Sequence, residues 1–160
     1  MSEGDLVAGR YRLLSLAGRG AVGAVYRARD EETGDLVAVK LLRGDAEDDV
    51  QRFAQEAAIL RKVAHPAVVR YVDHGRTEVD GDYLVMEWLE GETLAARIAR
   101  GPLSVADAFT MAARVLEGLG AAHRRSLVHR DLKPANVFLA GGDPADARVL
   151  DFGLARAVHD

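Results

Sequence analysis

The sequence has no cysteine, few lysines and no long hydrophobic run. The absence of cysteine excludes disulfide bonds and any zinc, haem or iron–sulfur site held by thiolates. With 21 basic and 25 acidic residues among 160, the formal net charge is −4, which does not indicate a dedicated nucleic-acid-binding protein. No apolar stretch approaches the roughly 18 residues of a membrane-spanning helix, and the start resembles no secretory signal. We therefore expect a soluble, cytoplasmic protein of about one domain.

Lysine is scarce although arginine is abundant. The basic residues are 18 arginines and only three lysines, at Lys40, Lys62 and Lys133. Because arginine serves most needs for positive charge in this chain, a position that keeps lysine indicates a need for a compact ammonium group.

The first half of the chain is predicted to consist mainly of strands. Short runs rich in valine, leucine and tyrosine alternate with turns that contain glycine. Over residues 36–42 both faces are apolar apart from Lys40, which predicts a central, covered strand with a charge in the interior. The predicted elements are strands at 11–17, 24–29, 36–42, 68–73 and 83–88, and a helix at about 46–64.

The second half is predicted to be mainly helical. Ser104 precedes an apolar helical pattern and is followed three residues later by Asp107, an arrangement similar to a capping box. The predicted elements are helices at 92–100 and 104–124 and short strands at 137–139 and 148–150.

Three glycines, Gly18, Gly20 and Gly23, form the pattern G-x-G-x-x-G-x-V. In a dinucleotide-binding fold this pattern lies between a strand and a helix, whereas here it lies between two strand-like runs. It therefore favours a glycine hairpin whose backbone N–H groups cover phosphates. An ordinary glycine turn is the alternative.

A buried lysine needs an anion near it. Glu56 lies on the apolar face of the predicted helix at 46–64, so it needs a cation for the same reason, and pairing it with Lys40 would remove both costs. Two alternatives remain open. In the first, Glu56 is a boundary residue that reaches solvent. In the second, Asp49 is the partner of Lys40, although the helix dipole alone explains an acidic residue in the first turn.

Residues 129–136 form the densest polar cluster, with the sequence His-Arg-Asp-Leu-Lys-Pro-Ala-Asn. Fifteen residues after Asn136 comes Asp151, directly after an apolar pair, where a carboxylate at a strand end suits Mg²⁺. Taken singly, His129 is more often a packed core residue, and Asp-Phe-Gly at 151–153 is a plausible turn. Their order and spacing together indicate function.

The sequence resembles the eukaryotic-type protein kinases in four motifs that follow one another in the same order: the glycine loop, Val-Ala-Val-Lys at 37–40, the segment at 129–136 and Asp-Phe-Gly. Its composition, rich in alanine and arginine, together with the segment at 129–136 is similar to bacterial Ser/Thr kinases. The resemblance implies an α+β, protein-kinase-like fold with a five-stranded antiparallel N-lobe sheet, one helix, and the first helical part of an incomplete C-lobe. The implied domains are an N-lobe with hinge at 1–89 and the start of the C-lobe at 90–160.

The resemblance also implies roles for single residues. Asp131 would orient the substrate hydroxyl and accept its proton, and Lys133 would steady the γ-phosphate, as in Ser/Thr kinases. Asn136 and Asp151 would hold Mg²⁺.

The resemblance also implies how ATP is bound. Glycines would cover the phosphates, and a lysine paired with Glu56 would contact them. Apolar side chains and the backbone of a connecting segment would surround the adenine. These residues are Gly18, Gly20, Gly23, Val25, Ala38, Lys40, Met86, Glu87, Leu89 and Phe138.

The resemblance ends soon after the Asp-Phe-Gly motif. The family continues with an activation segment and further helices, so we expect a truncated kinase whose helix at 104–124 leaves an apolar patch open to a partner or to self-association. The predicted function is a protein Ser/Thr kinase fragment that uses ATP and Mg²⁺. The alternative is a non-catalytic ATP-binding or interaction module. The protein substrate is not identified by these motifs.

Overall fold

The computed structural model describes residues 2–20, 23–42, 55, 57–77 and 81–152. The chain divides into two compact units, each with its own internal packing. The first contains the described residues of Met1–Arg61 together with Tyr71–Trp88, and the second contains Lys62–Arg70 and the described residues of Leu89–Gly153.

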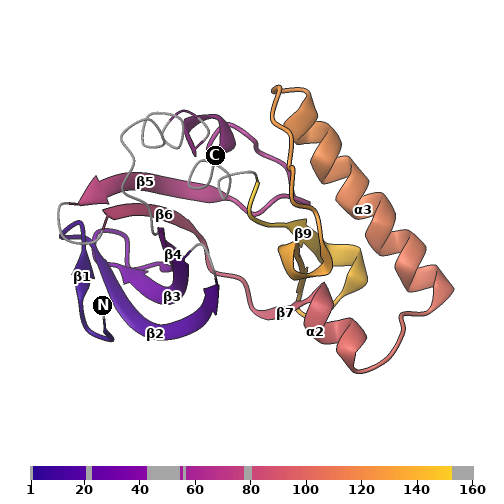
Figure 1. Ribbon diagram of the computed structural model, residues 1–160, viewed down its shortest axis with the longest axis horizontal. Helices are drawn as coiled ribbons and strands as arrows, with labels where there is room; N and C mark the ends of the chain where they lie inside the picture. Colours follow the sequence, from indigo (N-terminus) through magenta and orange to yellow (C-terminus); the bar gives the residue numbers. More distant parts are fainter. Residues whose placement is uncertain (1, 21–22, 43–54, 56, 78–80, 153–160) are drawn as a thin grey trace. The chain divides into compact units, whose positions relative to one another are not determined.

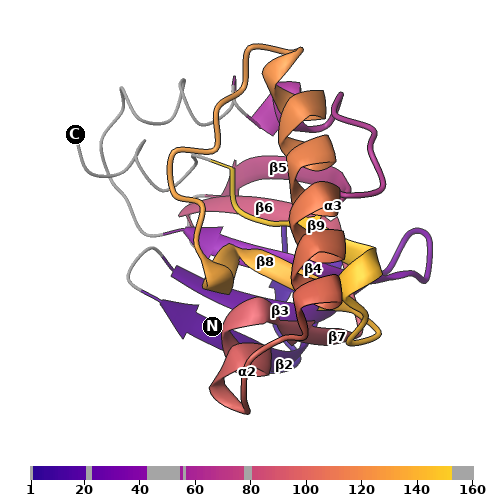
Figure 2. The ribbon, with the colours of Figure 1, turned by 90° about the vertical axis from the view of Figure 1, so that its right-hand side faces the viewer.

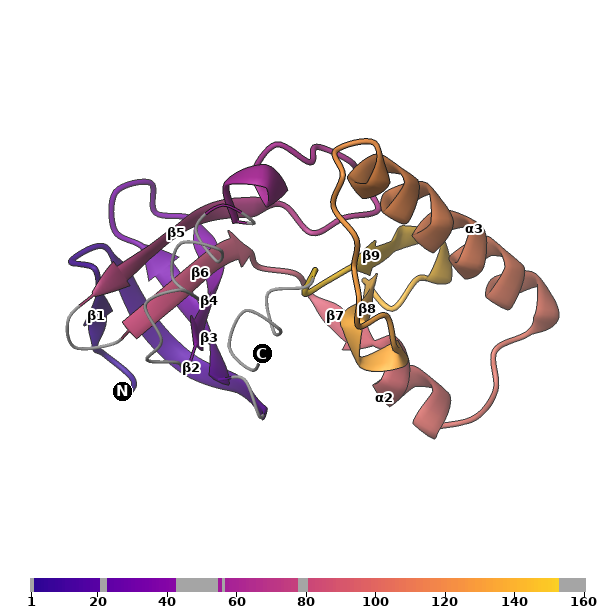
Figure 3. The same cartoon turned by 45° about the horizontal axis from the view of Figure 1, so that its top comes forward.

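The first unit is built on an antiparallel sheet of six strands in the order β1-β2-β3-β4-β6-β5 (Figures 1 and 3). The sequence predicted five strands, and the additional strand is the two-residue β1 at the edge of the sheet. The strands are β1 (Leu6–Val7), β2 (Tyr11–Gly20), β3 (Gly23–Asp30), β4 (Leu36–Leu42), β5 (Tyr71–Thr77) and β6 (Gly81–Glu87).

The central strand β4 is covered on both sides, as its apolar pattern predicted. One face of the sheet forms a hydrophobic core. Tyr26, Val39 and Val85 lie side by side on neighbouring strands of this face and belong to the core. Lys40 lies on the opposite face and is only 8% exposed, which confirms the interior charge. The core consists of Val7, Tyr11, Leu13, Tyr26, Ala28, Val37, Val39, Tyr83 and Val85.

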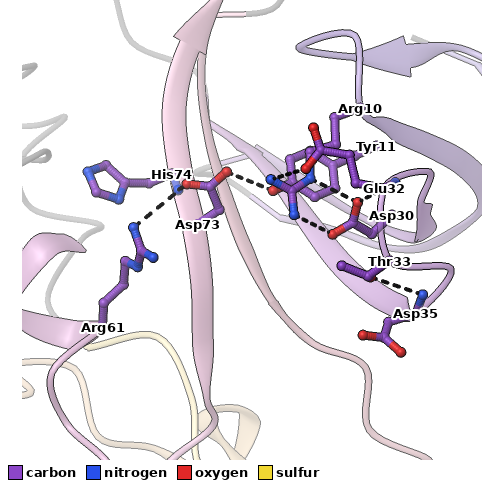
Figure 4. A network of polar contacts seen from close by, with 9 residues as sticks. All are labelled: Arg10, Tyr11, Asp30, Glu32, Thr33, Asp35, Arg61, Asp73 and His74. Atoms are coloured by element: carbon purple, nitrogen blue, oxygen red, sulfur yellow. Dashed lines mark hydrogen bonds and ion pairs between the residues drawn. The ribbon is translucent and has the colours of Figure 1, made fainter.

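A polar network fastens β2 to β3 and β5 (Figure 4). The Arg10 guanidinium donates to both Asp30 oxygens, over 2.8 and 2.6 Å, and lies 2.9 Å from Glu32. The hydrogen bond from Arg10 lowers the pKa of the buried Asp30 carboxyl to about 2. The Tyr11 hydroxyl donates to Asp73 over 2.7 Å, and burial followed by this bond raises the pKa of Tyr11.

The helix predicted at 46–64 falls largely outside the described residues. Its described part is helical at 55 and 57–60, where Ala57 and Leu60 are fully buried. This burial agrees with the predicted apolar face.

The second unit combines a three-stranded antiparallel sheet, in the order β7-β8-β9, with two helices and two short 3₁₀ turns (Figure 2). The sheet consists of β7 (Gly91–Thr93), β8 (Val137–Ala140) and β9 (Ala147–Val149). The helical elements are α2 (Leu94–Ala99), α3 (Val105–His123), η1 (Pro134–Asn136) and η2 (Pro144–Asp146).

Helix α3 begins at the predicted cap and packs along β9 and η2. The Ser104 hydroxyl accepts a hydrogen bond from the Asp107 backbone N–H over 3.0 Å, which satisfies one of the unpaired N–H groups of the first turn. One side of α3 is buried, whereas Val105, Phe109 and Leu116 are 74%, 74% and 66% exposed. No helix of the described residues is long and apolar enough to cross a membrane.

The strand predicted at 68–73 begins later, at Tyr71, and belongs to the first unit. The preceding residues have other partners. Val69 N–H donates to the Val149 carbonyl over 3.1 Å, and Val149 N–H donates to the Ala67 carbonyl over 2.8 Å. These bonds attach the segment at 67–69 to β9, so it does not continue β5.

Candidate functional site

The three glycines lie where β2 ends and β3 begins. Gly20 and Gly23 are the last paired residues described before the turn, so the pattern stands between two strands, as predicted. At Gly23 a Cβ atom would lie 1.9 Å from the Leu41 carbonyl oxygen, and the φ angle is +155°, so the fold itself requires glycine there. At Gly18 and Gly20 a Cβ would meet none of the described residues within 4 Å. These two glycines leave the backbone open to close approach by a ligand.

Four predicted nucleotide-binding residues share one face of the first sheet. Val25 is paired with Lys40, and Ala38 with Met86, and residues directly opposite each other in a sheet present their side chains on the same face. This face is the one opposite the hydrophobic core. Lys40, Ala38 and Met86 are buried there, at 8%, 6% and 6% exposure, and Val25 is partly buried.

Glu56 lies outside the described residues, so its predicted pairing with Lys40 stays a prediction. Glu87 ends β6 and is paired with Val37. Leu89 follows two residues later and is assigned to the second unit.

In the second unit, Asp131, Lys133 and Asn136 come together. The Lys133 ammonium lies 2.9 Å from Asp131 Oδ2, and the Asn136 Nδ2 group donates to the Asp131 carbonyl over 2.8 Å and to its Oδ2 over 3.3 Å. The bond from Lys133 is the main cause that lowers the pKa of the Asp131 carboxyl. Asp131 is therefore a carboxylate at neutral pH, exposed enough to meet a ligand.

His129 connects this cluster to the segment before Asp151. Its Nε2 donates to the Leu150 carbonyl over 2.6 Å, and its Nδ1 accepts a bond from the Asp131 backbone N–H over 3.3 Å. With these partners, Nε2 is the donor of the ring and Nδ1 is its acceptor. The ring also packs against Phe152, with centroids 4.8 Å apart. His129 is thus a packed core residue, which was the alternative weighed for it from the sequence. It also orients neighbouring polar groups.

The backbone of Leu150 is fixed on both sides. Its carbonyl accepts from His129, and its N–H donates to the Asn136 carbonyl over 2.9 Å. The next residue, Asp151, has a φ angle of +53°, an uncommon value for a residue other than glycine. The two predicted metal ligands, Asn136 and Asp151, are therefore on hydrogen-bonded neighbouring segments.

The residues present fit a magnesium ion bound together with phosphates. Both partners of the Asn136 amide nitrogen are acceptors, so the NH₂ group faces them and the side-chain oxygen is left for another ligand. Within the described ranges, no three His, Asp or Glu side chains gather into a metal site. Two oxygen ligands, completed by water and substrate phosphates, are the set that Mg²⁺ commonly takes in nucleotide sites.

Phe138 lies on β8 between the buried Val137 and Leu139 and is itself partly buried on the opposite side of the strand. The kinase resemblance implied a place for Phe138 beside the adenine but gave no indication of the polar role of His129. No sequence signal carries that role, because the Leu150 carbonyl is 21 residues away.

This fold and arrangement of polar groups define a known class. The protein kinase domain model matches residues 11–160, so the chain belongs to the protein kinase family. The solved kinase domain of Mycobacterium tuberculosis PknI superimposes with a TM-score of 0.86 and 26% identity, covering 96% of this chain and 62% of that one. The fold is therefore the α+β kinase fold, with part of its second lobe.

Curated relatives include bacterial serine/threonine kinases. Pkn2 of Myxococcus xanthus is 42% identical over 157 residues, which are 94% of this chain and 19% of that protein. PknA of Mycobacterium tuberculosis is 36% identical over 163 residues, which are 97% of this chain and 37% of that protein. The chain thus spans about a fifth to somewhat over a third of the length of these relatives. A structure of Rad53 in complex with AMP-PNP is also similar, at 29% identity and a TM-score of 0.80, covering 91% of this chain and 38% of that one.

Proposed function

We propose that the chain provides the nucleotide-binding and catalytic residues of a protein serine/threonine kinase, which transfers the γ-phosphoryl group of ATP to a Ser or Thr hydroxyl. The observation that carries the proposal is the cluster in which His129, Asn136 and Leu150 fix the segments bearing Asp131 and Asp151. Membership of the kinase family and the similarity to bacterial Ser/Thr kinases support it.

The proposed domain assignment follows the resemblance. Residues 1–89 would be the N-lobe and hinge, and residues 90–160 the start of the C-lobe. In the first, backbone N–H groups around Gly18, Gly20 and Gly23 would cover the phosphates, and the Lys40 ammonium would contact the α- and β-phosphates. Val25, Ala38 and Met86 would contact the adenine, with Phe138 from the second part, and the backbone at 87–89 would bond its edge.

Asp131 would orient the attacking hydroxyl. An ionised carboxylate with a lowered pKa accepts a hydrogen bond well but is a weak base. The hydroxyl would therefore be held in line first, and its proton would pass to Asp131 Oδ as the bond from the hydroxyl oxygen to phosphorus forms and the bond to the β-phosphate oxygen breaks.

Lys133 would act on the same carboxylate and on the phosphoryl group. Its ammonium lies 2.9 Å from Asp131 Oδ2 and would bring positive charge to the side where charge develops during transfer. Asn136 and Asp151 would hold Mg²⁺, which supplies charge neutralisation at the phosphate oxygens when it is bound. The enzyme would act in the cytoplasm on a protein that these residues do not identify.

The test is ATP binding by calorimetry, with and without Mg²⁺, followed by transfer from γ-labelled ATP to casein. The substitution Asp131→Asn keeps the shape of the side chain and should lower the transfer rate by at least about 100-fold. ATP binding should change little. Asp107→Asn, an exposed acid on α3, is the control and should leave transfer unchanged.

Three outcomes are informative. Loss of transfer in Asp131→Asn alone supports the proposal. Undiminished transfer in that variant would overturn the role of Asp131. Binding of ATP without any transfer by the unaltered chain would instead favour the non-catalytic nucleotide-binding module.

A further inference from the structure

Arg27 lies on the sheet face that carries the proposed nucleotide-binding residues. It is paired with Ala38, which is paired in turn with Met86, and this row is next to the row of Val25 and Lys40. An arginine is unexpected at this place, because Ala38, Met86 and Lys40 beside it are buried.

The guanidinium group of Arg27 lies over the ring of Trp88. The guanidinium carbon lies 5.7 Å from the centroid of the indole ring, within the range of cation–π contacts. Its Nε is buried and has no hydrogen-bond partner among the described residues. The contact with the Trp88 ring therefore contributes to holding the guanidinium group in place.

Trp88 links Arg27 to the segment that is proposed to bond the adenine. It follows Glu87, the last residue of β6, and both residues belong to the segment whose backbone is proposed to bond the adenine edge. A ring held by a stacked guanidinium restricts the rotation of the Trp88 side chain and with it the backbone of that segment. Both Arg27 and Trp88 belong to the first unit.

We propose that Arg27 is a positioning residue for the adenine end of the nucleotide, acting through Trp88. This inference rests on the proposed function. Arg27 touches neither the phosphates nor the reacting atoms in this arrangement. Its loss should therefore weaken the binding of the adenine portion and leave the phosphate portion unaffected.

The substitution Arg27→Met removes the charge and keeps an unbranched side chain. It should raise the dissociation constants of ATP and adenosine by about three- to tenfold, the range expected of a partly buried cation–π contact. The dissociation constant of inorganic tripolyphosphate should not change. Arg27→Lys should restore part of the affinity, because an ammonium keeps the charge but not the planar stack.

Arg29→Met is the matched control, since Arg29 lies on the same strand, two residues along on the same face, and is exposed. Trp88 is the only tryptophan of the chain, so its fluorescence reports the contact directly. The emission spectrum of the free protein should change in Arg27→Met and stay the same in Arg29→Met.

A double-mutant cycle with Trp88→Leu, measured by calorimetry with the full chain, tests the pathway. If Arg27 acts through Trp88, the two substitutions together should cost no more adenosine affinity than Trp88→Leu alone. Additive losses would overturn the inference, as would equal weakening of adenosine and tripolyphosphate, which indicates general distortion of the sheet. Unchanged adenosine binding in Arg27→Met would also overturn it while leaving the proposed function intact. Failure of the unaltered chain to bind ATP would overturn both.

Discussion

Asp30 is a carboxylate buried in the first unit, with both oxygens bonded to Arg10. Its pKa of about 2 lies below the value of 3.8 expected without these contacts. Because the folded-state pKa is lowered, the stabilisation is complete above about pH 4 and is lost as the pH falls through 2.

The substitution Asp30→Asn should reduce the free energy of unfolding at pH 7 by about 1–3 kcal/mol, the usual value of hydrogen bonds to charged groups. It should also flatten the dependence of stability on pH between 4 and 2. Thermal melts across this range measure both effects. Glu31→Gln is the control, because Glu31 forms an exposed ion pair with Arg12 and should change stability by less than about 0.5 kcal/mol. Equal losses in the two variants would contradict the argument.

Single residues were predictable where a local pattern fixes their surroundings. The burial of Lys40 followed from the two apolar faces of its strand, and the approach of Lys133 to Asp131 is consistent with their spacing of two residues. The bond from His129 to Leu150 was not predictable, because it joins residues 21 positions apart and depends on how the second unit packs.

At the scale of elements, α3 approaches the segment at 67–69 closely at Gly118. A Cβ there would lie 2.7 Å from the Ala67 carbonyl oxygen, which is backbone and cannot move aside easily. Gly118→Ala should therefore lower the free energy of unfolding by about 1–3 kcal/mol, in urea denaturation, through overpacking.

Gly120 in the same helix gives the opposite expectation. Among the described residues, a Cβ there would meet only the end of the flexible Arg124 side chain, at 3.5 Å. Gly120→Ala should raise stability by up to about 1 kcal/mol, because alanine favours the helix. A rise in stability in both variants would show that the contact with Ala67 is not tight.

The elements themselves were predicted unevenly. The sequence placed α3 within a residue of its bounds, since a serine cap and a long helical periodicity act locally. It misplaced the start of β5, because Val68 and Val69 have the composition of a strand but bond to β9. The sixth strand, β1, was missed because it consists of only two residues, Leu6 and Val7, which are too few to show a periodic pattern.

At the scale of the whole chain, α3 exposes large apolar side chains at Val105, Phe109 and Leu116. We expect the purified 160-residue chain to bind the dye ANS, and the double substitution Phe109→Glu with Leu116→Glu to reduce this binding while the circular dichroism spectrum is retained. Ala106→Glu with Ala113→Glu adds the same charge at exposed positions of the same helix and should have little effect. Equal reductions would contradict a role for the apolar groups.

The fold class was predictable at this scale only through four motifs in one order, which the family match over residues 11–160 bears out. Composition and periodicity alone predicted only that the first half of the chain is mainly strands and the second half mainly helices. The division of the described chain into two units, with Lys62–Arg70 in the second, follows from backbone bonds between distant segments that no local pattern contains.

The two-sided attachment of Leu150 has a consequence for protein design. Asp151 directly follows a residue whose carbonyl is bonded by His129 and whose N–H is bonded by the Asn136 carbonyl. A designer who grafts this cluster onto another scaffold therefore has to transplant residues 129–136 and 147–152 together as one piece.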